Sequence, residues 1–160
     1  MKFPTPERTE RGGKFLTLGN GKSVIGVFRG EIGCFYQAFI GGKYVDVPST
    51  DANGTFRFQI NVIINENGEL VPKIFQGNYF DFQALQELNE QFPLESTYMK
   101  ISQTGERQSK RISFVPQTKA KPDENKIKHI MLLPVKKSES TPDMPSYFND
   151  GPPYDEEIPF

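Results

Sequence analysis

The sequence predicts a small, mainly β domain with a single helix and an acidic C-terminal tail. Short stretches of β-branched and aromatic residues recur along the chain, separated by Gly- and Asn-containing turns, a pattern typical of antiparallel strands. Only residues 80–92 space their apolar side chains as a helix does. From residue 138 onward there is no Lys or Arg, and five of the 23 residues are Pro, which disfavours both helix and sheet.

The first third of the chain predicts a flexible N-terminal arm and four strands. Residues 1–13 are rich in Pro, Gly and charged residues and show no periodicity. Strands are expected where β-branched and aromatic residues concentrate, at 14–18, 22–29, 34–40 and 43–47. Gly-containing segments separate them at 19–21, 30–33 and 41–42. The segment 30–33 is therefore expected to break the second strand from the third.

The clearest strand is expected at residues 55–64. Its apolar side chains alternate with polar ones, so one face is expected in the core and the other in water. The apolar face carries Phe56, Phe58, Ile60, Val62 and Ile64, and the polar face carries Thr55, Arg57, Gln59 and Asn61. A cation and two amides on one face suit a strand that lines a polar groove, and an ordinary solvated face is the alternative.

The second half of the chain predicts one helix and four further strands. A turn at 65–68 and a strand at 70–75 complete a hairpin with the strand before them. In the helix at 80–92, Asp81 could cap the start, and Pro93 stops the end. The remaining strands are expected at 97–102, 107–115 and 129–135.

These elements together predict a small barrel. A helix that joins the third and fourth long strands is typical of the OB-fold, a five-stranded Greek-key barrel that binds oligonucleotides. The sequence therefore predicts an OB-fold domain over residues 14–137, flanked by the arm at 1–13 and a disordered acidic tail at 138–160. An SH3-like barrel and an open α+β sandwich remain alternatives, because periodicity alone does not separate these folds.

The residue inventory excludes several classes of protein. The single cysteine, Cys34, excludes an intrachain disulfide, and together with the single histidine, His129, it leaves too few ligands for a structural zinc site. There is no stretch of 18 apolar residues, and the N-terminus lacks an apolar signal core. No phosphate-binding loop and no paired nucleophile and base can be recognised. We therefore expect a cytoplasmic protein that is not an enzyme and needs no cofactor.

The net charge of −1 hides a division along the chain. Residues 138–160 hold six of the 20 acidic residues and none of the 19 basic ones, so residues 1–137 carry 19 basic against 14 acidic residues, a net of +5. A basic domain with an acidic tail suggests a nucleic-acid partner. A solvated charged surface with an unrelated tail is the alternative.

Aromatic and basic residues are interleaved along the predicted strands, as in Phe28-Arg29, Lys43-Tyr44 and Tyr98-Met99-Lys100. Single-stranded nucleic acid needs this combination, because cations hold its phosphates and flat rings stack on its bases. Most of the 14 Phe residues must fill the core, since the chain has no Trp. The residues predicted to face outward and contact single-stranded DNA are Arg29, Phe35, Tyr36, Arg57, Tyr98, Lys100, Arg107 and Arg111.

The chain ends in an acidic and apolar tip made of Asp155, Glu156, Glu157, Ile158, Pro159 and Phe160. A partner needs only an apolar pocket for Ile158 and Phe160 with Arg or Lys at its rim, and Pro159 limits the backbone freedom lost on docking. This tip resembles that of bacterial single-stranded DNA-binding proteins, whose tails end in acidic residues followed by Ile-Pro-Phe. The resemblance implies that the tip recruits replication, recombination or repair proteins.

Three pieces of the body, residues 26–31, 56–61 and 99–105, resemble phage-encoded single-stranded DNA-binding proteins. The resemblance implies a protein of the bacterial host cytoplasm that coats single-stranded DNA in replication, recombination or repair. The bacterial proteins stack bases largely on Trp and assemble through the barrel, so their contact residues and their tetramer do not carry over to a chain without Trp. An adaptor whose barrel does not bind DNA and a small nuclease are the alternatives, and RNA stays open as the ligand.

Overall fold

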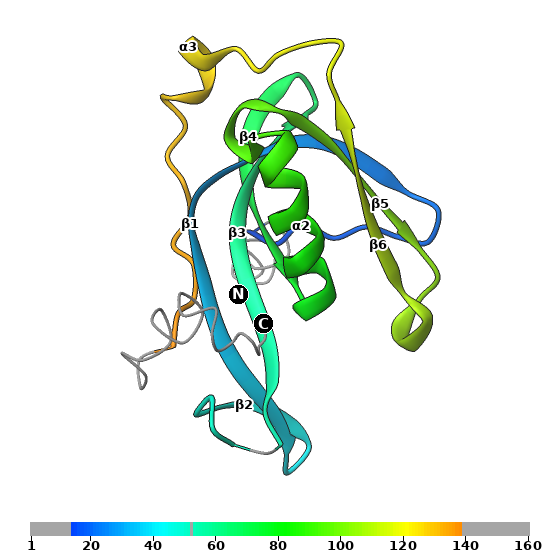
Figure 1. The fold of residues 1–160 in the computed structure, drawn as a ribbon, viewed down its shortest axis with the longest axis vertical. Helices are drawn as coiled ribbons and strands as arrows, with labels where there is room; N and C mark the ends of the chain where they lie inside the picture. The colour runs from blue at the N-terminus through cyan, green and yellow to red at the C-terminus, as the bar shows by residue number, and fades with distance from the viewer. Residues whose placement is uncertain (1–13, 52, 139–160) are drawn as a thin grey trace, which may run out of the picture. The chain divides into compact units, whose positions relative to one another are not determined.

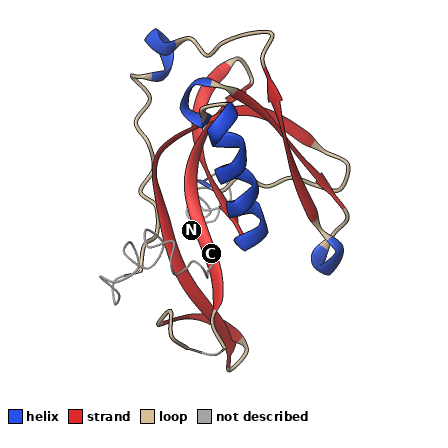
Figure 2. Ribbon diagram, in the orientation of Figure 1, coloured by secondary structure: helices blue, strands red, loops and turns tan. Residues whose placement is uncertain are grey.

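The computed structural model describes residues 14–51 and 53–138 of the chain (Figure 1). Strands dominate it, and six of them form one antiparallel sheet accompanied by two α-helices (Figure 2). The mainly β class is therefore confirmed. The elements are β1 (Ser23–Ile40), β2 (Lys43–Val47), β3 (Thr55–Glu66), β4 (Glu69–Gly77), α2 (Tyr79–Gln91), η1 (Leu94–Ser96), β5 (Tyr98–Thr104), η2 (Arg107–Ser109), β6 (Arg111–Gln117) and α3 (Glu124–Ile127).

The described residues divide into two compact units, which are called unit 1 (residues 14–32 with 59–135) and unit 2 (residues 33–51 and 53–58 with 136–138). Hydrogen-bonded strands follow the order β4-β3-β1-β5-β6, and β2 pairs with β1. The edge strands β4 and β6 are not paired with each other in the described part of the chain, so the sheet is not closed. This order makes β1 the central strand.

β1 is one continuous strand of 18 residues, so the predicted break at 30–33 is wrong. Gly30 takes a left-handed conformation (φ +88°) inside the strand instead of ending it. Gly33 is buried, and a Cβ built on it would lie 2.2 Å from the carbonyl oxygen of Lys136. Gly30 therefore allows a local left-handed backbone conformation, and Gly33 allows the close approach of the Lys136 backbone. Neither glycine forms a turn.

Residues 14–18 do not form the predicted strand. They make one isolated parallel bridge, between Phe15 and Ile74 of β4, and the Leu16 N–H donates to the Ile74 carbonyl over 2.8 Å. The predicted turn at 19–21 is present, since the Lys22 N–H donates to the Gly19 carbonyl over 3.0 Å. The segment thus follows the edge of β4 without a full ladder of hydrogen bonds.

The core of unit 1 is built from rings and branched side chains of the sheet. The rings of Phe28, Phe75 and Phe114 meet edge to face, with centroid separations of 6.0, 6.1 and 5.5 Å. Burying one such ring contributes about 1.5–3 kcal/mol, and each edge-to-face pair adds roughly 0.5–1.5 kcal/mol. Met99 and Ile101 of β5 are fully buried.

The predicted helix is present as α2, but its cap is Asn78 and not Asp81. The Asn78 side chain accepts from the Asp81 N–H over 2.9 Å, and the Asp81 carboxylate accepts from the Asn78 N–H over 3.2 Å. This reciprocal pair is a capping box, which fixes the first turn of α2. Leu85 is the buried side chain of the helix. The short helix α3 lies in a region where the sequence predicted no helix.

Two residues of the polar face of β3, Gln59 and Asn61, are buried, so the expectation that they face water is wrong. Gln59 Nε2 donates to Gln76 Oε1 over 2.8 Å. Asn61 Nδ2 donates to the Leu133 carbonyl, and Asn61 Oδ1 accepts from the Leu133 N–H, both over 2.8 Å. The amides satisfy one another and the backbone, so alternation of apolar and polar residues here does not mark exposure.

Residues 129–135 do not form the predicted strand; they begin with a turn and a bend, have no regular secondary structure from residue 131 on, and are held at Leu133 by the Asn61 amide. The strand predicted at 107–115 begins later, at Arg111, because residues 107–109 form the 3₁₀ turn η2. The apolar character of 129–135 reflects packing: Ile130 and Leu132 contact a buried cluster of Val27, Ile63 and Ile127.

Candidate nucleic-acid interface

The eight residues predicted to contact DNA fall in both units. Unit 1 holds Arg29, Tyr98, Lys100, Arg107 and Arg111, and unit 2 holds Phe35, Tyr36 and Arg57. Arg107 lies in η2, and its side chain is outside the described part of the structure. The tip at 155–160 also lies outside the described residues.

In unit 1, the outer face of β1, β5 and β6 presents a cation between two apolar side chains. Lys100 lies opposite Ile25 of β1 on one side and Val115 of β6 on the other. Directly opposite residues share a face of the sheet, and all three are exposed, with Ile25 at 47% and Val115 at 48%. This row combines a charge for a phosphate with apolar surface for sugars and bases.

The same face continues toward the hairpin between β5 and β6. Ser102 lies opposite Ser23 and Ser113, and Arg111 lies opposite Thr104. Four residues of strand separate the Lys100 row from the Arg111 row, which is roughly 13 Å at about 3.3 Å per residue. Two exposed cations, Lys100 and Arg111, therefore stand on one face with hydroxyl groups between them. The structure brings these two predicted residues to the same face.

Tyr98 begins β5 and is half-buried, as it packs against the cluster of Val27, Ile63 and Ile127. One side of its ring is thus used for packing. Arg29 is engaged as well: its guanidinium donates to both carboxylate oxygens of Glu124, over 2.5 and 3.0 Å, and the side chain is 15% exposed. The hydrogen bonds to Glu124 raise the pKa of Arg29, and those from Arg29 lower the pKa of Glu124. Both terminal guanidinium nitrogens of Arg29 are therefore already bonded to the Glu124 carboxylate.

In unit 2, the predicted outward orientation of Phe35 is wrong, because its ring is 2% exposed. The Lys136 ammonium lies 4.8 Å from the ring centroid and also pairs with Asp46 over 2.7 Å. Because β1 runs without a break, Phe35 keeps the inward side that buried Gly33 occupies two residues earlier. A ring so enclosed offers no face to a base.

Tyr36 and Arg57 are half-buried neighbours of Phe56. The Tyr36 and Phe56 rings meet edge to face with centroids 5.7 Å apart. Arg57 Nη1 donates to the carbonyl oxygen of Phe56 over 3.1 Å. Tyr36 thus contacts the Phe56 ring and Arg57 the Phe56 backbone, with part of each side chain accessible.

The hairpin between β1 and β2 carries an exposed aromatic pair that the sequence reasoning did not select. Phe39 is 64% and Tyr44 62% exposed, and their rings pack together with centroids 5.0 Å apart. The two residues are cross-strand partners, and Gly41 and Gly42 close the turn at φ +63° and +85°. Both glycines at positive φ are typical of a tight hairpin turn. The sequence feature that could have identified this pair is an aromatic residue on each side of a Gly-Gly turn.

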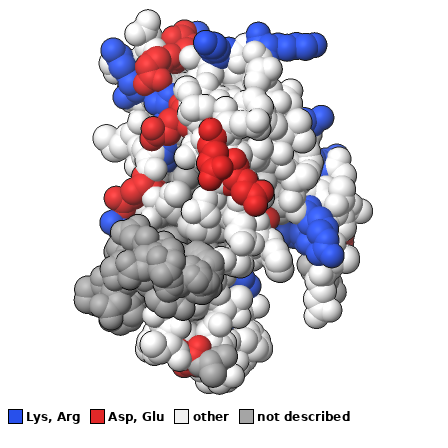
Figure 3. All heavy atoms as spheres, viewed as in Figure 1, with Lys and Arg blue, Asp and Glu red and all other residues white. Residues whose placement is uncertain are grey.

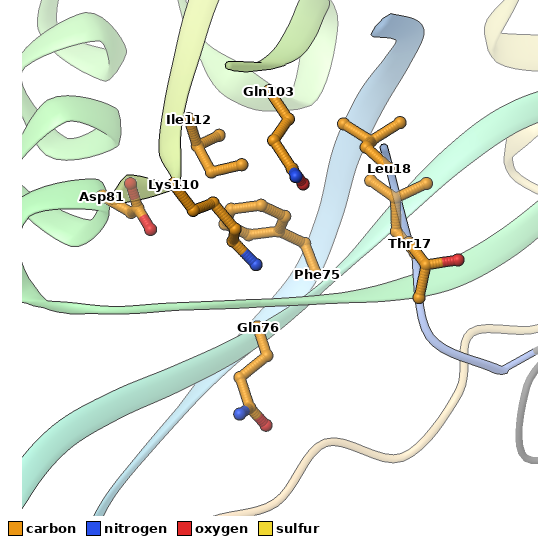
Figure 4. A pocket seen from close by; sticks show the side chains of 9 residues that line it. Thr17, Leu18, Phe75, Gln76, Asp81, Gln103, Lys110 and Ile112 are labelled. Carbon is orange, nitrogen blue, oxygen red and sulfur yellow. The ribbon is translucent and has the colours of Figure 1, made fainter. Parts of the chain in front are cut away.

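A small hollow of about 140 Å³ lies in unit 1 between the end of β4 and the start of β6 (Figure 4). Its lining residues are Leu16, Thr17, Leu18, Phe75, Gln76, Asp81, Gln103, Lys110 and Ile112. Lys110 extends into it beside Phe75 (Figure 4). Residues 16–18 thus form one wall of the space between the two edge strands of the sheet.

No protein-family model matches the chain, and no curated protein and no solved structure matches it. Among residues 14–51 and 53–138, no helix has the length and apolar character to cross a membrane. In the same residues, no three His, Cys, Asp or Glu side chains gather where they could hold a metal ion. The case for a function therefore depends on the surface chemistry described above.

Proposed function

We propose that the protein binds single-stranded DNA without strong sequence preference, coats it during replication, recombination or repair, and recruits partner proteins through the tip at 155–160. The observation that carries the proposal is the pair of exposed rings on the β1–β2 hairpin, Phe39 and Tyr44. Rings that are more than three-fifths exposed contribute little to the stability of the core. Stacked bases gain about 1–3 kcal/mol each from such rings, whatever their sequence.

The phosphate-binding part of the proposal rests on the exposed cations of β5 and β6. Lys100 and Arg111 are exposed on one face, and the residues up to 137 carry a net charge of +5. Each phosphate that a cation neutralises releases counterions, so affinity should fall as salt rises. Tyr36 and Arg57 supply a third ring and a cation within unit 2.

We further propose that β1, β3, β4, β5 and β6 are the five strands of an OB-fold barrel. In support, α2 joins the third of these strands to the fourth, as is typical of that fold, and β4 and β6 are the two ends of the strand path. OB-folds bind oligonucleotides with the loops after the first and fourth strands. The β1–β2 hairpin and residues 105–110 occupy these places in the chain order.

The proposal is tested by fluorescence anisotropy of the full-length protein with labelled oligo-dT and with a duplex of equal length, at low and moderate salt. We expect salt-sensitive binding to the single strand alone. Phe39→Ala with Tyr44→Ala should weaken it at least about 30-fold, since two stacked bases are lost. The matched control is Met131→Ala, which removes another apolar side chain that is 86% exposed and should change nothing.

A protein-recruitment adaptor is the second candidate, because the exposed pair of Phe39 and Tyr44 also suits a protein partner. The same titration separates the two. Absence of binding to either oligonucleotide at low salt would reject the DNA proposal and leave the adaptor. The double variant Lys100→Glu with Arg111→Glu also distinguishes the two candidates. For a DNA-binding protein, it should reduce the slope of log affinity against log salt concentration by roughly one for each lost phosphate contact. It should leave an adaptor unaffected.

A further inference from the structure

A second, larger hollow of about 400 Å³ lies in unit 1 between the first turn of α2 and the start of β6. Its lining residues are Asn78, Phe80, Asp81, Ala84, Lys110, Arg111 and Ile112. Three of these, Asp81, Lys110 and Ile112, also line the smaller hollow beside β4. The two hollows therefore adjoin and share one wall.

Phe80 forms the apolar side of this larger hollow. It is the second residue of α2, and its ring is 77% exposed. The capping box of Asn78 and Asp81 fixes the backbone on both sides of Phe80. The ring is therefore carried on a fixed turn, outside the core, where helix formation itself does not require an aromatic residue.

Two cations form the opposite side. Lys110 and Arg111 are both exposed, and neither takes part in an ion pair within the described part of the chain. The Arg111 backbone is fixed by its pairing with Thr104. In Figure 3 a group of Lys and Arg atoms lies over the start of β6, beside acidic atoms near α2. The hollow thus has a positive wall and an aromatic wall.

We infer that this hollow is an additional contact site for single-stranded DNA, at which a base stacks on Phe80 while neighbouring phosphates lie on Lys110 and Arg111. A nucleotide separates its phosphate from its base by a sugar, which matches cations and a ring on opposite walls. Asp81 also lines the hollow, and a carboxylate accepts hydrogen bonds from base N–H groups, such as the N3–H of thymine. An acidic peptide would bring its carboxylates close to Asp81.

This inference rests on the proposed function and extends the DNA path from the sheet to the start of α2. Arg111 connects the two surfaces, since it stands at the end of the β5–β6 face and also lines the hollow. Oligonucleotides long enough to reach from one surface to the other should therefore depend on Phe80.

The absence of Trp from the chain permits a direct test. Phe80→Trp places a single fluorescent indole in the hollow of the full-length protein. Titration with unlabelled oligo-dT of about 30 nucleotides should quench its fluorescence, with the dissociation constant that anisotropy gives for the same variant. Met131→Trp, at a position that is 86% exposed, is the matched control and should not be quenched.

Phe80→Ala provides the affinity measurement. It should weaken binding of the long oligonucleotide about five- to a hundredfold, the loss expected for one stacked base. Thermal unfolding of each variant checks that an exposed substitution leaves the fold intact. Lys110→Ala with Arg111→Ala should lower the salt slope with the long oligonucleotide.

The outcomes separate this inference from the proposed function. If the wild type binds oligo-dT but Phe80→Trp is not quenched and Phe80→Ala binds normally, the site is rejected and the function stands. If the wild type does not bind oligo-dT, both fall. If a synthetic peptide of residues 150–160 quenches Phe80→Trp and oligo-dT does not, the hollow is a peptide site and the nucleotide assignment is overturned.

Discussion

Replacing Asn61 by alanine should destabilise unit 1 by about 2–4 kcal/mol. The Asn61 amide makes two hydrogen bonds of 2.8 Å to the backbone of Leu133, and the residue is 2% exposed. Removing one partner of a buried hydrogen bond costs about 1–3 kcal/mol for each group left unsatisfied. Two groups give roughly 2–6 kcal/mol. Leu133 is half-buried, so water reaches it in part and the lower part of that range applies.

Urea unfolding followed by circular dichroism measures the change, and amide hydrogen exchange at Leu133 reports where it acts. The matched control is Asn65→Ala in the same strand. Asn65 Oδ1 accepts from the Gly68 N–H over 2.9 Å, but the residue is exposed, so water replaces the lost bond and the cost should stay below about 1 kcal/mol. Equal losses for the two variants would refute the view that the buried amide holds the segment 129–135.

Three further predictions concern other contacts. Gly33→Ala should displace the chain at Lys136, because the added Cβ would lie 2.2 Å from the Lys136 carbonyl oxygen. We expect the free energy of unfolding to fall by roughly 1–3 kcal/mol and the Ser138 N–H to exchange faster; unchanged exchange there would contradict the contact. Burial raises the pKa of the Cys34 thiol to about 12, so iodoacetamide at pH 8 should modify it at least about 100-fold more slowly in the folded than in the urea-unfolded protein, and equal rates would show an accessible thiolate. Hydrogen bonds from Arg29 lower the pKa of Glu124 below its ordinary 4.5, so the stability from this pair is complete above that pH and is lost as the pH falls through the lowered value; Glu124→Gln should lower the urea midpoint at pH 7 and have no effect near pH 2, and an equal effect at both would exclude the charge as its cause.

Hairpins and the helix were predictable because their signals are local. The Gly-Gly turn between β1 and β2 and the turn before β4 need positive φ, which glycine and asparagine supply. The helix α2 shows its period within 13 residues. The cap was misplaced by three residues, because in a capping box Asn78 and Asp81 satisfy each other, and either one alone resembles a cap.

Burial of polar groups was not predictable from the local pattern. Alternation along β3 marked Gln59 and Asn61 as exposed, whereas partners far along the chain, Gln76 and Leu133, make their burial favourable. The apolar run at 129–135 is only partly buried, with Ile130, Leu132 and Leu133 half-buried and Met131 exposed, and partial burial does not specify whether a segment pairs as a strand. Its hydrogen bonds go to a side chain instead.

The candidate site was predictable in its chemistry and only in part in its residues. Lys100 and Arg111 are exposed on one face as expected, while Phe35 is enclosed and Arg29 is paired with Glu124. Aromatic residues favour strands both in cores and on surfaces, so sequence alone did not distinguish Phe35 from Phe39. Whether each ring points inward or outward depends on β1 running as one continuous strand. The glycines at positions 30 and 33 suggested a break in that strand instead.

The contacts of residues 133–138 have a mechanical consequence. The Ser138 N–H donates to the Cys34 carbonyl over 3.0 Å, Lys136 pairs with Asp46, and Leu133 is bonded to Asn61. Tension applied to the chain beyond residue 138 reaches the folded part through these contacts in that order. Any load on the chain beyond residue 138 is thus taken up in sequence by the central strand β1, by β2 and then by β3, before it reaches α3.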